Sequence, residues 1–188
     1  MLCREFYNSI IPVMFRSLNA YSAFRNKCTE ENFNTKQSLK SWSAAECIHH
    51  LLVTEKSYFP QLESLISENT ETDRGLAPFR KTFFGTIMLF SVSPAPRFKL
   101  KAPSVFKPET SVTHSLSLLD DYETHNSSVI KLFENASNLD LSELKIHSPA
   151  TDRIKYNLGE TFMIIFNHRL RHIAQAERAL SYREGLKK

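Results

Sequence analysis

Cysteine, glycine and long hydrophobic runs are all scarce in this sequence. The three cysteines among its 188 residues, Cys3, Cys28 and Cys47, are too few and too scattered for a disulfide scaffold, which favours a reducing compartment. The longest uncharged stretch, residues 82–96, is broken by prolines and falls short of the roughly 20 apolar residues of a transmembrane helix. The first residues show no signal-peptide pattern. We therefore expect a soluble, cytoplasmic protein with no membrane partner.

The low glycine count and the average composition indicate an ordinary globular chain. Four glycines and eight prolines argue against a collagen-like or linker-rich architecture, and 41% hydrophobic with 23% charged residues is typical of a folded protein. A domain of this length buries roughly 70% of the surface of its unfolded chain, so it needs no disulfide or structural metal to fold. We expect residues 1–188 to form a single domain.

Acidic residues are missing from residues 74–107, and this segment makes the protein basic. The formal net charge is +4, and without the seven basic residues of the segment the remaining chain would stand at −3. These residues are Arg74, Arg80, Lys81, Arg97, Lys99, Lys101 and Lys107. Interleaved phenylalanines could stack on bases, or they could pack the segment onto the protein while the charges face water. A net charge of +4 is small for a nucleic-acid binder, so we favour the interpretation in which the phenylalanines pack the segment onto the protein. An intermediate alternative is that the basic residues line the entrance of a binding site and attract an anionic substrate.

Four stretches of the sequence repeat apolar residues at three- and four-residue spacing, which is typical of amphipathic helices. They cover about residues 6–27, 43–66, 111–136 and 157–182. No stretch alternates every second residue, and the one strand-like run, residues 83–92, contains Gly85. The pattern therefore predicts an all-α protein, a four-helix bundle without a convincing strand. The long connection between the second and third helices would permit them to run parallel, and long loops in compact domains are usually functional.

Two of these helices have recognisable starts. Ser43 with Glu46, and Asn157 with Glu160, have the spacing of a capping box, in which each residue of the pair satisfies a free backbone amide of the other. This pattern explains Glu46 as a capping residue more simply than as a catalytic base.

The seven histidines include one pair with the spacing of metal ligands. His168 and His172 are four residues apart, so a helix places both imidazoles on one face, and small or apolar residues continue that stripe. The pair could bind a metal ion, or it could be two part-buried histidines satisfied by hydrogen bonds. A third ligand would come from another helix, where His49 and His50 are the obvious candidates. Periodicity does not choose between these two.

Two ordered motifs resemble those of the DinB-like superfamily of metal-binding helical bundles. Trp42 begins a stretch that resembles the W-S-x-x-E-x-x-x-H-L opening of the second helix of that superfamily. His168 begins a stretch that resembles the H-x-x-R-H-x-x-Q signature of its last helix. The lysine- and proline-containing residues 98–108 also resemble the approach to the third helix, so the resemblance covers about residues 5–180.

The resemblance implies a fold and a set of metal ligands. The superfamily fold is a four-helix bundle of up-down-down-up topology, with a long connection between helices two and three. Its metal-ligand histidine eight residues after the tryptophan corresponds here to His50, and the last helix supplies His168 and His172. All three matching positions are histidine, and the role of His49 is left open. Members include metal-dependent thiol transferases and maleylpyruvate isomerases, and many have no assigned reaction.

Three neutral imidazoles suit a divalent metal ion, of which Zn²⁺ and Ni²⁺ are the preferred candidates and Fe²⁺ and Mn²⁺ the next. Three protein ligands leave at least one coordination position open for a water molecule or a substrate. The expected function is therefore that of a metal-dependent enzyme of the thiol-transferase or hydrolase class, with a small-molecule substrate for which an anionic thiol is one candidate. A non-catalytic metal-binding module is the first alternative. Anion or nucleic-acid binding through residues 74–107 is the second, and a homodimer is left open.

No dependable general base emerges from the sequence. We expect Glu55, a little over one turn beyond His50, to be solvated, and Arg169 and Arg171 to point away from the metal towards surface partners. Cys47 lies near the ligand helix and could be a reactive thiol, but a buried structural cysteine is the commoner case. Gln175 could donate a hydrogen bond to a metal ligand.

Overall fold

A computed structural model describes residues 1–69, 74–93, 103–108, 110 and 112–186 of the chain. This part of the chain is mostly helical, with five α-helices, one 3₁₀ turn and a small two-stranded sheet. In chain order the elements are α1 (Cys3–Arg25), α2 (Ala44–Ser67), α3 (Phe83–Val92), η1 (Ser104–Phe106), α4 (Ser117–Asn135), β1 (Lys145–Ser148), β2 (Thr151–Asn157) and α5 (Leu158–Leu186).

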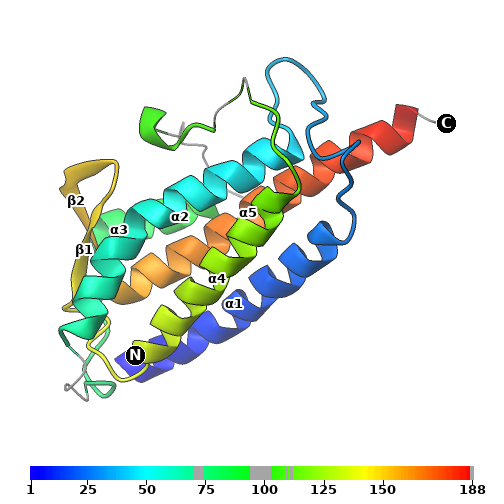
Figure 1. Cartoon of the computed structure of the whole chain (residues 1–188). Coiled ribbons are helices and arrows are strands. Elements are labelled where there is room, and N and C mark those ends of the chain that lie inside the picture. Colours follow the sequence, from blue (N-terminus) through cyan, green and yellow to red (C-terminus); the bar gives the residue numbers. More distant parts are fainter. Residues whose placement is uncertain (70–73, 94–102, 109, 111, 187–188) are drawn as a thin grey trace.

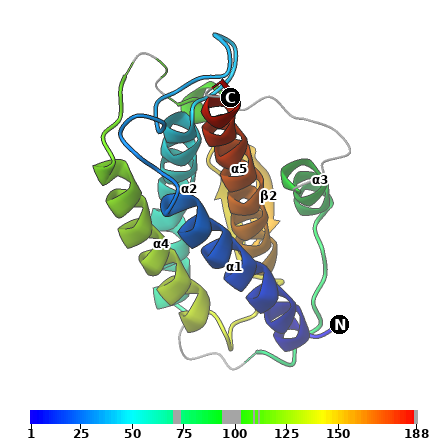
Figure 2. The ribbon, with the colours of Figure 1, turned by 90° about the vertical axis from the view of Figure 1, so that its right-hand side faces the viewer.

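The four long helices α1, α2, α4 and α5 lie side by side, as both ribbon views show (Figures 1 and 2). Helix α5 is the most central of them, because it packs against α1, α2 and the short helix α3. Two apolar clusters fill the interior. One is centred on residues such as Phe133, Phe162 and Phe166, and the other on residues such as Tyr122 and Ile173. The α2–α5 contact spans both clusters, so a polar site on these two helices has a rigid apolar frame.

The predicted helix starts are confirmed by their hydrogen bonds. The Ser43 hydroxyl accepts from the Glu46 backbone amide at 3.1 Å, and the Glu46 carboxylate accepts from the Ser43 amide at 2.8 Å. At the start of α5, the Asn157 side chain accepts from the Glu160 amide at 2.7 Å. These caps satisfy amides that the first helical turn would otherwise leave without partners.

The helical class predicted from periodicity is confirmed, but the expectation of only four helices and no strand is wrong. Residues 83–92 form helix α3, and strands β1 and β2 pair as an antiparallel hairpin with Ile146 opposite Tyr156. Both strands are short and bury few side chains, so they carry too little alternation to be read from the sequence. The third long helix starts at Ser117 instead of about residue 111, and the last one continues to Leu186.

Helix α3 is placed by a close approach to the start of α5. The Thr82 amide and hydroxyl donate to the two Glu160 carboxylate oxygens at 2.8 and 2.7 Å, and the same hydroxyl caps α3 through the Gly85 amide. A Cβ atom at Gly85 would lie 2.2 Å from the Glu160 carboxylate, so this position accepts glycine for steric reasons. The glycine that argued against a strand is therefore a packing requirement of a helix.

The expectation that the phenylalanines of residues 74–107 pack onto the protein is correct only in part. Phe79 and Phe106 are buried, whereas Phe83, Phe84 and Phe90 are substantially exposed. Arg80 and Lys81 face solvent, and Arg97, Phe98, Lys99 and Lys101 lie outside the described residues. Within the described part of the chain, no helix combines the length and the apolar character that crossing a membrane would need.

Candidate metal centre

Three histidines from two helices meet in the interior. His50 comes from α2, and His168 and His172 come from consecutive turns of α5. One ring nitrogen of each lies within 4.8 Å of the others, and the Nε2 atoms of His50 and His168 are 3.3 Å apart. His50 and His172 are buried, while His168 is partly exposed. The chain thus brings together the three histidines that the resemblance indicated.

A backbone carbonyl orients the histidine of α2. The Nδ1 atom of His50 lies 2.5 Å from the Phe106 carbonyl oxygen. A carbonyl can only accept, so His50 donates through Nδ1–H and its Nε2 lone pair is left facing the other two histidines. Such a hydrogen bond on the far nitrogen is the usual means by which proteins fix a metal-binding imidazole. Because Phe106 belongs to η1, the long connection between α2 and α4 takes part in the site.

The surroundings keep these imidazoles neutral. Burial lowers the pKa of His50, although the Phe106 carbonyl opposes this change. The pKa values of His168 and His172 are lowered well below the ordinary value, first by burial and then by neighbouring histidines and Arg171. A neutral imidazole keeps the lone pair that a metal ion requires.

The donor set fits a divalent metal ion. Buried polar atoms usually have a hydrogen-bond partner, yet the buried Nδ1 of His172 has none of good geometry among the described residues. The Gln175 side chain is near enough to this histidine to oppose the lowering of its pKa. The Trp42 ring covers this side of the cluster, with its centroid 4.9 Å from that of His50 and 5.8 Å from that of His172. Three neutral nitrogen donors, an unsatisfied nitrogen and an aromatic cover are compatible with an ion of the borderline type that imidazole prefers.

His49, the other candidate on α2, lies outside the cluster. Its ring stacks on that of His114, with a centroid separation of 4.8 Å. Consecutive residues of a helix point about 100° apart, so the two neighbouring histidines of α2 face different surroundings. Periodicity alone could not identify which of them faces α5, because the orientation depends on how the helices pack.

The expectation that Glu55 is solvated is wrong, and so is the outward placement of Arg169. Both side chains are almost completely buried, at 2% and 1% exposure. Arg169 donates through Nε to Glu55 Oε1 at 2.8 Å and through Nη2 to Glu55 Oε2 at 2.6 Å, and it also donates to Asn126. The Tyr122 hydroxyl donates to the same carboxylate at 3.2 Å. Glu55 is therefore occupied as an ion-pair partner, and this ion pair joins α2 to α5 next to the histidines.

A sequence signal for this pair existed. Glu55 is in phase with Leu51, Tyr58 and Leu62 on the apolar face of α2, so its position is that of a core residue. Arg169 carries the same signal, because it is in phase with Phe162, Phe166 and Ile173 on the buried face of α5. Neither pattern shows that the two side chains pair, because they lie 114 residues apart along the chain.

The other chemically interesting residues take structural roles. Glu46 caps α2 and accepts from Lys36 Nζ at 2.6 Å. Cys47 is fully buried, and burial raises the pKa of its thiol to about 12, which leaves it protonated and unreactive near neutral pH.

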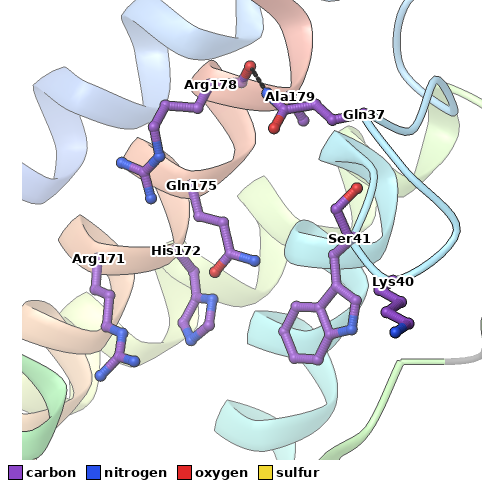
Figure 3. A pocket seen from close by; sticks show the side chains of 9 residues that line it. Gln37, Lys40, Ser41, Arg171, His172, Gln175, Arg178 and Ala179 are labelled. Atoms are coloured by element: carbon purple, nitrogen blue, oxygen red, sulfur yellow. Dashed lines mark hydrogen bonds between the residues drawn. The ribbon is translucent and has the colours of Figure 1, made fainter. Parts of the chain in front are cut away.

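Two pockets reach the histidine cluster from different sides. The first has a volume of about 340 Å³ and is bordered by His172, Gln175 and three basic residues, Lys40, Arg171 and Arg178 (Figure 3). Arg171 thus lines a pocket beside a histidine of the cluster, where an outward position was expected, and it donates to the Ser91 backbone carbonyl. The second pocket, about 90 Å³, is mostly apolar and is bordered by His168.

A model of the DinB superfamily matches residues 16–176, which is most of the chain. No curated protein and no solved structure matches it.

Proposed function

The chain belongs to the DinB superfamily, and from this premise we propose that His50, His168 and His172 bind one divalent metal ion in an enzyme of the thiol-transferase or hydrolase class. The observation that carries the proposal is the convergence of three ring nitrogens within 4.8 Å, one of them oriented by the Phe106 carbonyl. Zn²⁺ or Ni²⁺ is the preferred ion, and Fe²⁺ or Mn²⁺ is the alternative.

The residues of the site have separable tasks under this proposal. Three protein ligands leave at least one coordination position for a substrate or water. When bound, the ion would lower the pKa of a thiol or water molecule at that position. The buried ion pair of Glu55 with Arg169 holds α2 against α5, so the nitrogens of the two helices keep their separation. Trp42 limits the access of bulk water to His50 and His172.

The basic pocket supports an anionic substrate. Figure 3 shows the side chains of Arg171, Arg178 and Lys40 around the opening above His172. Burial lowers the pKa of Arg171, but the ordinary value is so high that the guanidinium stays charged. Positive charge at the mouth of a site raises the local concentration of anions. We propose that a small thiol bearing carboxylate or phosphate groups enters here.

We propose that the four long helices form the up-down-down-up bundle of the superfamily, within one domain. Glu55 and Phe59 of α2 contact Tyr122 and His125 of α4 in the same chain order, which supports parallel α2 and α4. The stacking of Tyr7 on Phe133 and the ion pair of Arg25 with Asp120 support antiparallel α1 and α4. Three free thiols support a reducing compartment such as the cytoplasm.

Metal analysis followed by turnover assays tests this function. Protein purified without a histidine tag should contain close to one equivalent of Zn²⁺ or Ni²⁺, and a chelator should remove it. Thiol transfer or ester hydrolysis that disappears with chelator and returns with metal would establish an enzyme. Stoichiometric metal without turnover of any thiol or ester would instead leave a metal-binding module.

A further inference from the structure

The apolar pocket beside His168 is built from parts of the chain that are distant in sequence. Its walls include Met88 and Val92 of α3, Phe106 of η1, and Ile164 and Ile165 of α5. Polar side chains also border it, those of Thr54, Glu55, Tyr58, Ser148 and His168, but most of its surface is apolar. The connection between α2 and α4 thus supplies both the cover of this pocket and the carbonyl that orients His50.

One unsatisfied hydroxyl lies in the lining of this pocket. Thr54 is only 8% exposed, and its Oγ1 has no hydrogen-bond partner among the described residues. A buried hydroxyl without a partner costs free energy, so its presence here points to a ligand that satisfies it. Glu55, which also borders the pocket, is already engaged by Arg169 and Tyr122. The hydroxyls of Tyr58 and Ser148 also border the pocket and interact with each other, and Nε2 of His168 lies 3.3 Å from that of His50. Thr54 is therefore the lining residue whose buried polar atom lacks a partner among the described residues.

The size of the pocket narrows the kind of molecule that fits. Its volume is about 90 Å³, whereas a protein cavity that binds benzene measures roughly 150 Å³. A pocket of this size suits a short aliphatic group better than an aromatic ring. A group of this kind gains free energy mainly by leaving water, in proportion to the area that it buries.

We propose that this pocket binds the short aliphatic portion of a second substrate, whose single polar group lies between the Thr54 hydroxyl and His168. The inference rests on the proposed function for the role of that substrate, because His168 belongs to the metal-binding cluster. The binding of the aliphatic group itself does not depend on a metal ion. The two pockets would then present an anionic molecule and a small aliphatic molecule to the same centre from different sides.

A series of linear alcohols, from ethanol to 1-octanol, tests the pocket in the full-length protein without metal. The methyl groups of its four methionines give separate NMR signals, and among them only Met88 borders the pocket. We expect the Met88 signal to shift while that of Met14, in the core, stays in place. Each methylene should tighten Kd about fourfold, and the gain should stop at a chain length set by the pocket. Benzyl alcohol should bind no better than ethanol.

Two variants and one control assign the binding to the residues named. Thr54→Val keeps the shape and removes the hydroxyl, so it should weaken 1-butanol several-fold without unfolding the protein. Val92→Phe fills the pocket and should weaken 1-butanol at least tenfold. Arg178→Ala, in the basic pocket, should leave it unchanged. The proposal would be overturned if the affinity for the alcohols did not depend on their chain length. It would also be overturned if the Thr54→Val variant and the unmodified protein bound 1-butanol equally well.

The same measurements in the presence of Zn²⁺ separate this inference from the proposed function. We expect Zn²⁺ to tighten the binding of 1-butanethiol at least tenfold and to change that of 1-butanol little. Chain-length dependence in a protein that binds none of Zn²⁺, Ni²⁺, Fe²⁺ and Mn²⁺ would support the pocket and refute the metal centre. Zn²⁺ binding without any dependence of alcohol affinity on chain length would support the metal centre and refute the pocket.

Discussion

His50 Nδ1 and the backbone carbonyl of Phe106 are 2.5 Å apart, although 56 residues separate them in the chain. This contact makes η1 part of the candidate metal centre, since it determines which nitrogen of His50 faces α5. It also shows why the long connection between α2 and α4 cannot be treated as a passive linker.

Loosening η1 should weaken metal binding. Phe106 is buried, and its side chain holds the turn in place, so Phe106→Ala should displace the carbonyl that orients His50. We expect a loss of about 10- to 100-fold in Zn²⁺ affinity, as is typical when the partner of a metal ligand is removed. Val105→Ala is the control, because Val105 is exposed. Competition with a chromophoric chelator measures both, and equal affinities would contradict the role of η1.

The two neighbouring histidines of α2 should differ sharply as metal ligands. His50→Ala should abolish stoichiometric metal binding, since two remaining imidazoles hold an ion weakly. His49→Ala should retain most of the metal, because His49 stacks on His114 outside the cluster. Elemental analysis of the two purified variants decides the matter. Retention of metal by both would mean that α2 supplies no ligand, and the enzyme proposal would fail with it.

Breaking the buried ion pair should be costly for folding. Arg169→Met leaves the Glu55 carboxylate buried without its main partner, and we expect the free energy of unfolding to fall by about 3–5 kcal/mol. The surface pair of Lys27 with Glu177 is the matched control, where Lys27→Met should cost about 1 kcal/mol or less. Urea titrations monitored by circular dichroism give both values. A small loss for Arg169→Met would show that the pair does not hold α2 against α5.

The stability of the metal-free protein should decrease as the pH falls below about 6.5. Burial lowers the pKa of four histidines, His50, His125, His168 and His172, in the folded state. At a pH between the lowered pKa values of the folded state and the ordinary value of the unfolded chain, the unfolded chain binds more protons than the folded one. The free energy of unfolding therefore rises with pH in this range. Each histidine contributes at most about 1.4 kcal/mol per pH unit.

Urea titrations at pH 7.5, 6.5 and 5.5 measure this slope. The variant His125→Leu, outside the metal cluster, should reduce the slope without changing metal content. A free energy of unfolding that is constant over this range would contradict the neutral, buried state of the histidines.

Cys47 should resist alkylation in the folded protein. Burial raises the pKa of the Cys47 and Cys28 thiols to about 12, so almost none of either is thiolate at pH 8. We expect iodoacetamide to label Cys47 rapidly only after denaturation, and mass spectrometry of digested protein reports each site. Rapid labelling of Cys47 in the folded protein would reopen its role as a reactive thiol.

Local interactions made part of this protein predictable from its sequence. The capping boxes at Ser43 and Asn157 depend on residues three positions apart, and the shared face of His168 and His172 depends on helical geometry alone. The family could likewise be recognised from two short motifs, and the family match covers residues 16–176. The hairpin and helix α3 cannot be predicted in this way, because their short segments carry little periodicity of their own.

The sequence by itself determined where the long helices lie and that two histidines share one face of the last of them, because spacing along a helix is a property of the chain alone. The family motif indicated His50 and not His49, although periodicity alone did not choose between them. Only the tertiary structure decided that the His50 ring meets those of His168 and His172, that Glu55 and Arg169 are buried as a pair, and that the Phe106 carbonyl reaches His50. These contacts join residues 56 to 118 positions apart. Such contacts depend on the rotation and offset of packed helices, which no local pattern encodes.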